Sequence, residues 1–576
     1  MSIDSYLPWR SNNLRNGYTV FLLFLVVAFA LYYNSLHNPT LFDDYFFLVI
    51  HDRPETWSFG LSPRIFDYLT IYWTQKLFGN GFMPQRVDNV CIHALDAALA
   101  FVLAKTLLTW LLSGRGDPER NIVSPEQLEQ ERNVFYASLM ASLLFLVHPV
   151  AVYDVAYLNQ RSTELATMGA LLTVLIFWEA LIRNSALYLA AAAGFYLLAL
   201  MGKEHSIMLP ALCIALAVLH DEGFKVARLK QLIPFRLACA AIALWVVIHN
   251  EGDLILGKAP EYTSHIMLKN YAQMHAGFAQ HHMLVYSIQT QATLFFNYWR
   301  FWLFPNPLAM SVDIRAAFAT SVISIYTLGS ALFLAYGLLA AALLLRGPSR
   351  MLRFLGFSLL CPWLLFWTEF TSLRLQEIFV LYRSYLWFVF LVPALAVVLY
   401  QLRSRSSMVV WALLLFTFIG CTLNRLGTFY SETTLWRDAA RLTDTIPDKR
   451  PGIERVYYNL GTAELKTDIP AIYPDALKNL LMAYQYVPDS ELKPQIMYNL
   501  ALTYKRLDNY KAAIGIYLPL VHEVSPENDS AWWLMGDCME RSGDDKGARQ
   551  AYIEACDLKN KFACDRLRDE PDLGRH

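Results

Sequence analysis

Residues 408–424 read MVVWALLLFTFIGCTLN, and residues 431–444, shortly after them, read SETTLWRDAARLTD. The first stretch is almost wholly apolar, and its length is close to the roughly 20 residues that a helix needs to cross a bilayer core. The second stretch is polar and charged, with the period of an amphipathic helix. The sequence therefore predicts a membrane domain over residues 1–430 and a helical domain outside the bilayer over residues 431–576.

The composition of the whole chain agrees with a membrane protein. Of its 576 residues, 56% are hydrophobic and 17% are charged, and the mean hydropathy is +0.31. Soluble globular proteins carry about a quarter charged residues, so a disordered chain and an ordinary cytosolic enzyme are excluded. The net charge of −1 gives no support for nucleic-acid binding. The eight cysteines form no CxxC pair, which excludes zinc-finger and thioredoxin-like sites.

Eleven segments of the first domain are predicted to span the membrane. They are residues 17–35, 90–112, 135–153, 165–182, 186–201, 207–220, 233–249, 321–345, 354–368, 378–399 and 408–424. The predicted fold is all-α, a transmembrane helical bundle followed by a TPR-like solenoid. Residues 290–304 are also apolar, but this segment is short and ends at Pro305. We expect it to be an interfacial or re-entrant helix on the external side.

Short loops rich in Lys and Arg predict the orientation in the membrane. If Arg10 and Arg15 are cytoplasmic, so are the basic loops at residues 225–236, 346–353 and 403–405. An odd number of spans then places residues 431–576 on the external side, together with two long loops at about 36–89 and 250–320. That side is a bacterial periplasm, for a protein of the inner membrane, or the lumen of the ER.

The second domain contains a repeated pattern. YNLG at 458–461, YNLA at 498–501 and WLMG at 533–536 place small residues at Gly461, Ala501 and Gly536, with separations of 40 and 35 residues. The TPR period is about 34 residues, and stacked TPR helix pairs form a concave surface for extended peptides. We therefore expect a protein partner, with a helical cap that binds nothing as the alternative. A disulfide is expected between Cys538 and Cys556 in an oxidising compartment.

Charged and polar side chains next to apolar spans indicate function or paired structure, because such groups are costly at membrane depth. The candidates on the predicted external side are Asp43, Asp44, His148, Arg161, Glu164, Lys203, Glu204, Tyr382 and Arg383. A carboxylate pair can act as a general base or hold a divalent metal ion. Arg and Lys can hold a lipid-linked phosphate. Solvated turns and ion pairs within one helix are the structural alternatives.

These residues belong to motifs that resemble a known family. In chain order the motifs are Phe42-Asp43-Asp44, His93-Ala94-Leu95-Asp96-Ala97, His148-Pro149-Val150, Gln160-Arg161-Ser162-Thr163-Glu164, Gly202-Lys203-Glu204, Phe304-Pro305, Ser311-Val312-Asp313, Tyr382-Arg383-Ser384-Tyr385 and Leu435-Trp436. The ordered set, with repeats behind it, resembles the membrane glycosyltransferases of the GT-C superfamily. It looks most like the transmembrane-and-TPR O-mannosyltransferases (the TMTC group) and their bacterial relatives.

The resemblance implies transfer of a sugar from a polyprenyl-phosphate donor to Ser or Thr hydroxyls of exported proteins, such as a pilin in a bacterium. Carried over by position, Asp43 or Asp44 is the general base. The donor phosphate contacts are Arg161, Lys203 and Arg383, and the supporting residues are His148, Glu164, Glu204 and Tyr382. The need for a metal ion stays open, because some relatives use one and others do not.

Three other functions are alternatives to sugar transfer onto proteins. A glycosyltransferase with a lipid or glycan acceptor needs no peptide-binding repeats. A membrane scaffold that presents the repeats without catalysis needs no carboxylate pair. A transporter is disfavoured because the sequence shows no inverted repeat and no matching pair of broken helices.

Overall fold

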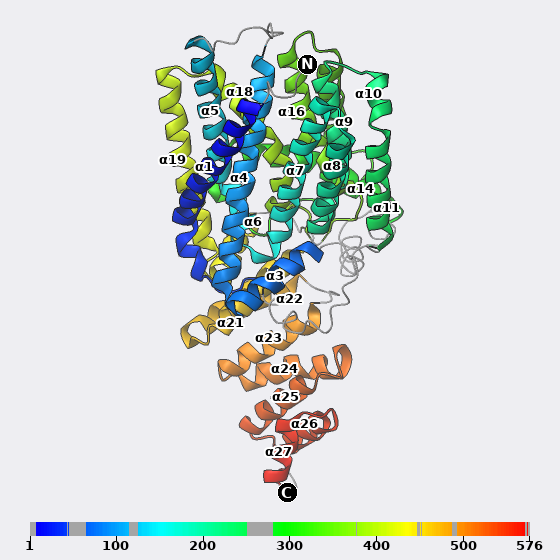
Figure 1. The fold of residues 1–576 in the computed structure, drawn as a ribbon. Helices are drawn as coiled ribbons and strands as arrows, with labels where there is room; N and C mark the ends of the chain where they lie inside the picture. Colours follow the sequence, from blue (N-terminus) through cyan, green and yellow to red (C-terminus); the bar gives the residue numbers. More distant parts are fainter. Residues whose placement is uncertain are drawn as a thin grey trace.

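The computed structural model describes residues 7–42, 44, 65–113, 125–249, 280–375, 377–445, 450, 452–486, 492–570 and 573. Within these ranges the chain is all-helical and contains no strand. Figure 1 shows a bundle of long helices, with the C-terminal helices stacked in a column that extends from one end of it. The N-terminus lies at the opposite end of the bundle.

The bundle is built from twelve longer helices and several short ones in the described residues. The longer helices are α1 (Leu7–Tyr32), α4 (Phe82–Leu112), α5 (Pro125–Leu146), α7 (Arg161–Arg183), α8 (Ala186–Gly202), α9 (Leu209–His220), α11 (Ile233–His249), α14 (Met283–Leu303), α15 (Ile325–Arg346), α16 (Arg350–Phe366), α18 (Val392–Gln401) and α19 (Arg405–Thr428). The other helices include α3 (Ile65–Phe78), α6 (Val152–Val155), α10 (Val226–Gln231), α17 (Tyr385–Phe388) and the 3₁₀ turns η4 (Pro149–Ala151), η6 (Glu204–Met208), η9 (Trp367–Phe370) and η10 (Leu381–Ser384).

The described helices make this a multi-pass membrane protein. Seven are long and apolar enough to cross a membrane, or eight if the bent pair Pro125–Leu146 and Pro149–Val155 is one span. All eleven predicted spans fall on helices. Three of these, Ala186–Gly202, Glu204–His220 and Ile233–Ile248, have only 10–17 residues, which is short for a bilayer core. Length and composition therefore identify seven or eight crossings, and the prediction of eleven also requires the three shorter helices to cross.

Two of the predicted cytoplasmic loops meet at one end of the bundle. Arg350, at the start of α16, donates to Glu222 at 2.7 Å and to the carbonyl oxygen of Ser113 at 2.6 Å. Glu222 follows α9 and Ser113 follows α4, so the ends of three helices come together there. This end lies opposite the C-terminal column (Figure 1).

The segment at 290–304 is longer than predicted. It forms the C-terminal part of α14, a 21-residue helix that begins at Met283 and is not among the candidate spans. Near one end Gln289 donates to the carbonyl of Val322 at 2.9 Å, and near the other the carbonyl of Trp302 lies 3.0 Å from His148 Nε2. These partners precede α15 and follow α5. Its placement as an interfacial or re-entrant helix stays a prediction.

The second domain is a row of antiparallel helices, each packed on the next. They are α20 (Glu432–Thr443), α21 (Ile453–Lys466), α22 (Tyr473–Gln485), α23 (Lys493–Arg506), α24 (Tyr510–Pro519), α25 (Asp529–Arg541), α26 (Asp545–Asp557) and α27 (Lys561–Asp569). The row begins at the predicted boundary: α19 ends at Thr428, and Ser431 caps α20 by accepting from the backbone N–H of Thr434.

The repeat seen in the sequence has a structural counterpart. A Cβ on Gly461 would lie 2.7 Å from Leu480 in α22, and one on Gly536 would lie 2.5 Å from Tyr552 in α26. Both glycines thus allow the first helix of a pair to approach the second. Left-handed residues at Asp468, Asp508 and Gly543 end the first helices of three pairs, and their separations of 40 and 35 residues equal those of the small residues.

The expected disulfide is wrong in its pairing. Cys556 bonds to Cys564, not to Cys538. The turn between α26 and α27 brings the Cα atoms of the bonded pair to 4.8 Å, whereas Cys538 is fully buried in the core of the row. Spacing along the chain did not reveal which cysteine the turn would bring to Cys556.

Candidate functional site

The first acidic motif lies at the end of the bundle that meets the C-terminal column. Asp43 lies outside the described residues. Asp44 is buried, and its carboxylate accepts from the backbone N–H of Leu41 at 3.2 Å and from that of Asn159 at 3.1 Å. The carboxylate therefore ties the loop after α1 to the turn before α7, which is a positioning role.

Arg86 of α4 braces the same loop from inside. Its guanidinium donates to the carbonyl oxygens of Asn38, Pro39 and Ala156 at 3.2, 2.6 and 2.7 Å. Only 2% of this side chain is exposed. Because a buried guanidinium is stable only when its N–H groups are satisfied, these contacts fix the path of the chain immediately before the acidic motif.

Arg161 begins α7 beside this loop and is fully buried. Its guanidinium donates to Asn89 at 2.8 Å and to the carbonyl of Gln85 at 2.6 Å, and Nη1 lies 3.6 Å from Asp88. Asp44 also lies near enough to attract it. The contacts of Arg161 therefore anchor α7 to α4, and its link to the acidic motif is the charge attraction to Asp44.

Lys203 directly follows α8 and is buried close to the start of α7. Its ammonium donates to Gln160 at 2.7 Å and to Thr163 at 2.6 Å, and lies 5.0 Å from the centre of the Tyr382 ring. These two acceptors are neutral oxygens, which a phosphate oxygen can replace with a gain in charge attraction. Of the three predicted phosphate contacts, Lys203 has the partners best suited to exchange.

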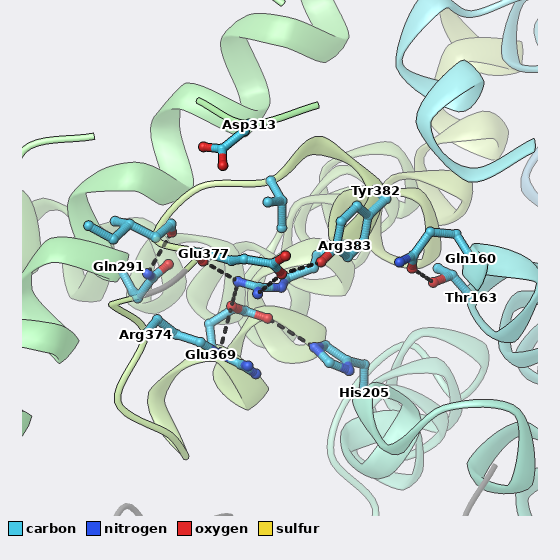
Figure 2. Close-up of polar contacts among 12 residues, drawn as sticks. Gln160, Thr163, His205, Gln291, Asp313, Glu369, Arg374, Glu377, Tyr382 and Arg383 are labelled. Carbon is cyan, nitrogen blue, oxygen red and sulfur yellow. Dashed lines mark hydrogen bonds and ion pairs between the residues drawn. The ribbon is translucent and has the colours of Figure 1, made fainter. Parts of the chain in front are cut away.

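Arg383 is held by two carboxylates. Its Nη1 lies 3.1 Å from Glu369, and its Nη2 lies 3.3 Å from Glu377. Glu369 is fully buried and also lies 3.2 Å from His205 Nε2 and 3.6 Å from Arg374. Figure 2 shows Glu369 between Arg383 and His205. The charge of Arg383 is therefore neutralised within the protein.

The network reaches the C-terminal domain through Arg455 of α21. This guanidinium lies 3.4 Å from Glu377 and 4.0 Å from Asp313, and 4.7 Å from the centre of the Phe42 ring. The Phe42 ring also lies 5.4 Å from that of Trp436 in α20. The residue that precedes the acidic motif is therefore packed against the first two helices of the C-terminal domain.

Glu377 remains charged in this network. Burial acts to raise the pKa of its carboxyl, but Arg455 and Arg383 outweigh that effect and hold the pKa at about 2. A pKa below the ordinary value of 4.5 means that the ion pairs stabilise the fold at neutral pH. That contribution is complete above about pH 4.5 and is lost as the pH falls from there to about 2.

The supporting residues are placed differently from one another. The ring nitrogens of His148 bond to the backbone N–H of Val150 and the carbonyl of Trp302, so they cap η4. The Tyr382 hydroxyl donates to Glu377 at 2.5 Å, and Glu204 lies 3.7 Å from His205 Nδ1. Glu164 is fully buried further inside the bundle.

Sequence reasoning missed Glu369 and Glu377. Both carry the signal that identified the other candidates, a charge next to an apolar run, but one lay just past a predicted span and the other just before the next. The spacing of residues along the chain also does not predict their partners, because Glu369 and His205 are 164 positions apart.

In the described ranges, no group of three His, Cys, Asp or Glu side chains is placed to hold a metal ion. No family model and no curated protein matches the chain. The geometry of the polar groups at this end of the bundle is therefore the basis for a functional proposal.

Proposed function

We propose that the protein transfers a sugar from a polyprenyl-phosphate donor to Ser or Thr hydroxyls of exported proteins. The main support for the proposal is that the predicted site residues are connected by an unbroken series of contacts. Asp44 contacts Asn159, Gln160 contacts Lys203, and Lys203 lies over Tyr382, next to Arg383. Acidic and basic groups from four distant parts of the sequence thus meet at one end of a membrane bundle.

The chemistry needs one base and one site for a leaving phosphate. The acceptor oxygen attacks the anomeric carbon as the bond from that carbon to the phosphate oxygen breaks, and the hydroxyl proton passes to a carboxylate. Positive charge stabilises the leaving phosphate. Because Asp44 is engaged by two backbone N–H groups, Asp43 is our candidate base, and Lys203 is our first candidate for the phosphate.

The repeats support a protein acceptor. The matched spacing of close-packed small residues and left-handed turns is the pattern of a TPR solenoid. Packing of Arg455 and Trp436 on Phe42 places the start of this solenoid against the acidic motif. An acceptor bound along the repeats would therefore be delivered close to the base.

We also propose that eleven spans place the solenoid outside the cytoplasm, in the periplasm of a bacterium or the lumen of the ER. Two observations support this orientation. Basic loops meet at the other end of the bundle, as the positive-inside rule requires of a cytoplasmic face. The Cys556–Cys564 disulfide is of a kind that persists in oxidising compartments.

The orientation predicts which introduced thiols react from outside the cell. Ile469, in the solenoid, is 48% exposed, and Ser406, in the first turn of α19, is also exposed. We expect a membrane-impermeant maleimide to label Ile469→Cys in intact cells, and Ser406→Cys only after permeabilisation. The reverse labelling would contradict the proposed sidedness, and the unaltered protein controls for reaction of its own cysteines.

The function itself is tested by intact-mass spectrometry of exported proteins from cells with and without this gene. We expect one or more exported proteins to lose a defined sugar mass and to regain it when the gene is restored. Loss of the sugar from a lipid or glycan instead would identify the alternative acceptor class. If the masses of the exported proteins, the lipids and the glycans are all unchanged, the non-catalytic scaffold is the better explanation.

A further inference from the structure

Three carboxyl groups are buried together deeper in the bundle than the site just described. Asp96 of α4, Asp154 of α6 and Glu164 of α7 are each 0% exposed, and each lies near enough to influence the charge of another. We call these three residues the acidic cluster. Neither oxygen of Asp154 or Glu164 has a hydrogen-bond partner in the described parts of the chain. Three ionised carboxylates in such a place would repel strongly without compensation.

A count of the hydrogen atoms available to Asp96 and its neighbours indicates whether Asp96 is ionised. His93 Nε2 lies 2.9 Å from the carbonyl oxygen of Leu146, so Nε2 carries a hydrogen. His93 Nδ1 lies 2.7 Å from the Tyr385 hydroxyl, which lies 3.1 Å from Asp96. These three contacts need three hydrogens. A neutral imidazole, a tyrosine and a carboxylate supply only two.

The third hydrogen has two places to reside. Either Asp96 is a neutral acid that donates to the Tyr385 oxygen, or His93 is an imidazolium and Asp96 a carboxylate. Both side chains are 0% exposed, and separated charges are far more costly to bury than neutral groups. Asp154 and Glu164 add further repulsion to a negative charge on Asp96. The neutral acid is therefore favoured.

A separate side chain also lies within electrostatic range of the acidic cluster. The hydroxyl of Tyr32 in α1 is fully buried and has no hydrogen-bond partner in the described residues, and Glu164 and Asp154 both act on its charge. A buried hydroxyl without a partner is costly. Its placement beside unpaired carboxyl oxygens fits a site where protons are shared among these groups.

Other charged groups face the cluster from its outer side. Lys203 attracts Asp154, and Arg161 attracts Glu164, whereas Asp67 of α3 repels Glu164. The charges that act on the cluster from this side are therefore of both signs.

We propose that the acidic cluster is a buried proton-binding site, in which Asp96 is a protonated carboxylic acid at neutral pH and donates to Tyr385. The ligand is the proton itself. The proposal does not depend on glycosyl transfer, because it follows from the hydrogen bonds and burial of these side chains alone.

The test is infrared difference spectroscopy of the full-length protein at pH 7. A protonated carboxyl absorbs at a higher carbonyl stretching frequency than a carboxylate and shifts in D₂O. We expect the wild-type minus Asp96→Asn spectrum to show loss of a protonated-carboxyl band. Asn preserves the fold because its amide can donate to the same Tyr385 oxygen. Loss of a carboxylate band instead, or no lost band, overturns the proposal.

Two further variants keep the test decisive. Asp438 pairs with Arg425 at 2.9 Å, so the Asp438→Asn difference should show loss of a carboxylate band only. If Asp96→Asn does not fold, Tyr385→Phe removes the acceptor of the Asp96 hydrogen and should move the protonated-carboxyl band. A band that does not move in Tyr385→Phe also overturns the proposal.

Discussion

Replacing Asp43 by Asn is expected to lower sugar transfer by about 10²- to 10⁴-fold, the usual contribution of a general base. The two adjacent carboxylates are expected to differ because Asp44 is occupied by two backbone N–H groups. The measurement is the fraction of the acceptor protein that carries the sugar, by intact mass. Cells are compared at equal levels of wild-type and variant enzyme.

Asp44→Asn is the matched control for this prediction. The amide offers one oxygen where the carboxylate offers two, so one buried N–H loses its acceptor at a cost of about 1–3 kcal/mol. We therefore expect Asp44→Asn to lower the free energy of unfolding, and transfer along with it. The assignment of the base to Asp43 fails if Asp43→Asn transfers normally while Asp44→Asn is inactive and fully stable.

The sequence predicted the helices well because hydrophobic length is a local property. Each predicted span falls on helical structure, although those at 135–153 and 378–399 are divided into shorter helices. The change of composition near residue 430 coincides with the Ser431 cap. The sequence was less informative about α14, because Gln289 and Gln291 lower its hydropathy. Their side chains bond to the carbonyls of Val322 and Ile378, which are contacts between segments far apart in the chain.

The sequence named several polar residues that the structure brings close together, such as Lys203 and Tyr382, but it did not predict which residues pair with one another. Arg383 was expected to hold a phosphate, yet its partners are Glu369 and Glu377. An arginine at a membrane surface carries the same sequence signal in both cases, since only tertiary structure decides whether a carboxylate reaches it. The same limit explains the disulfide, whose partner depended on how tightly α27 turns back on α26.

Glu369→Gln is expected to give the largest loss of stability among single substitutions in this network. Glu369 is fully buried and lies near Arg383, Arg374 and His205. Removing one partner of a buried ion pair leaves the other charge uncompensated, which typically costs 3–5 kcal/mol. Gln still bonds to one neighbour, so we expect a loss of about 3 kcal/mol in the free energy of unfolding, measured in mixed detergent micelles.

The control is Glu179→Gln, which removes an ion pair of similar length that is partly exposed instead of buried. Glu179 lies 3.2 Å from Arg183 within α7, and both side chains are about 30% exposed, so its loss should cost no more than about 1 kcal/mol. If the two variants lose equal stability, Glu369 is not the centre of the network. A larger loss for Glu369→Gln means that the buried ion pairs of Arg383 hold this end of the bundle together, so that the charge of Arg383 is committed to the fold.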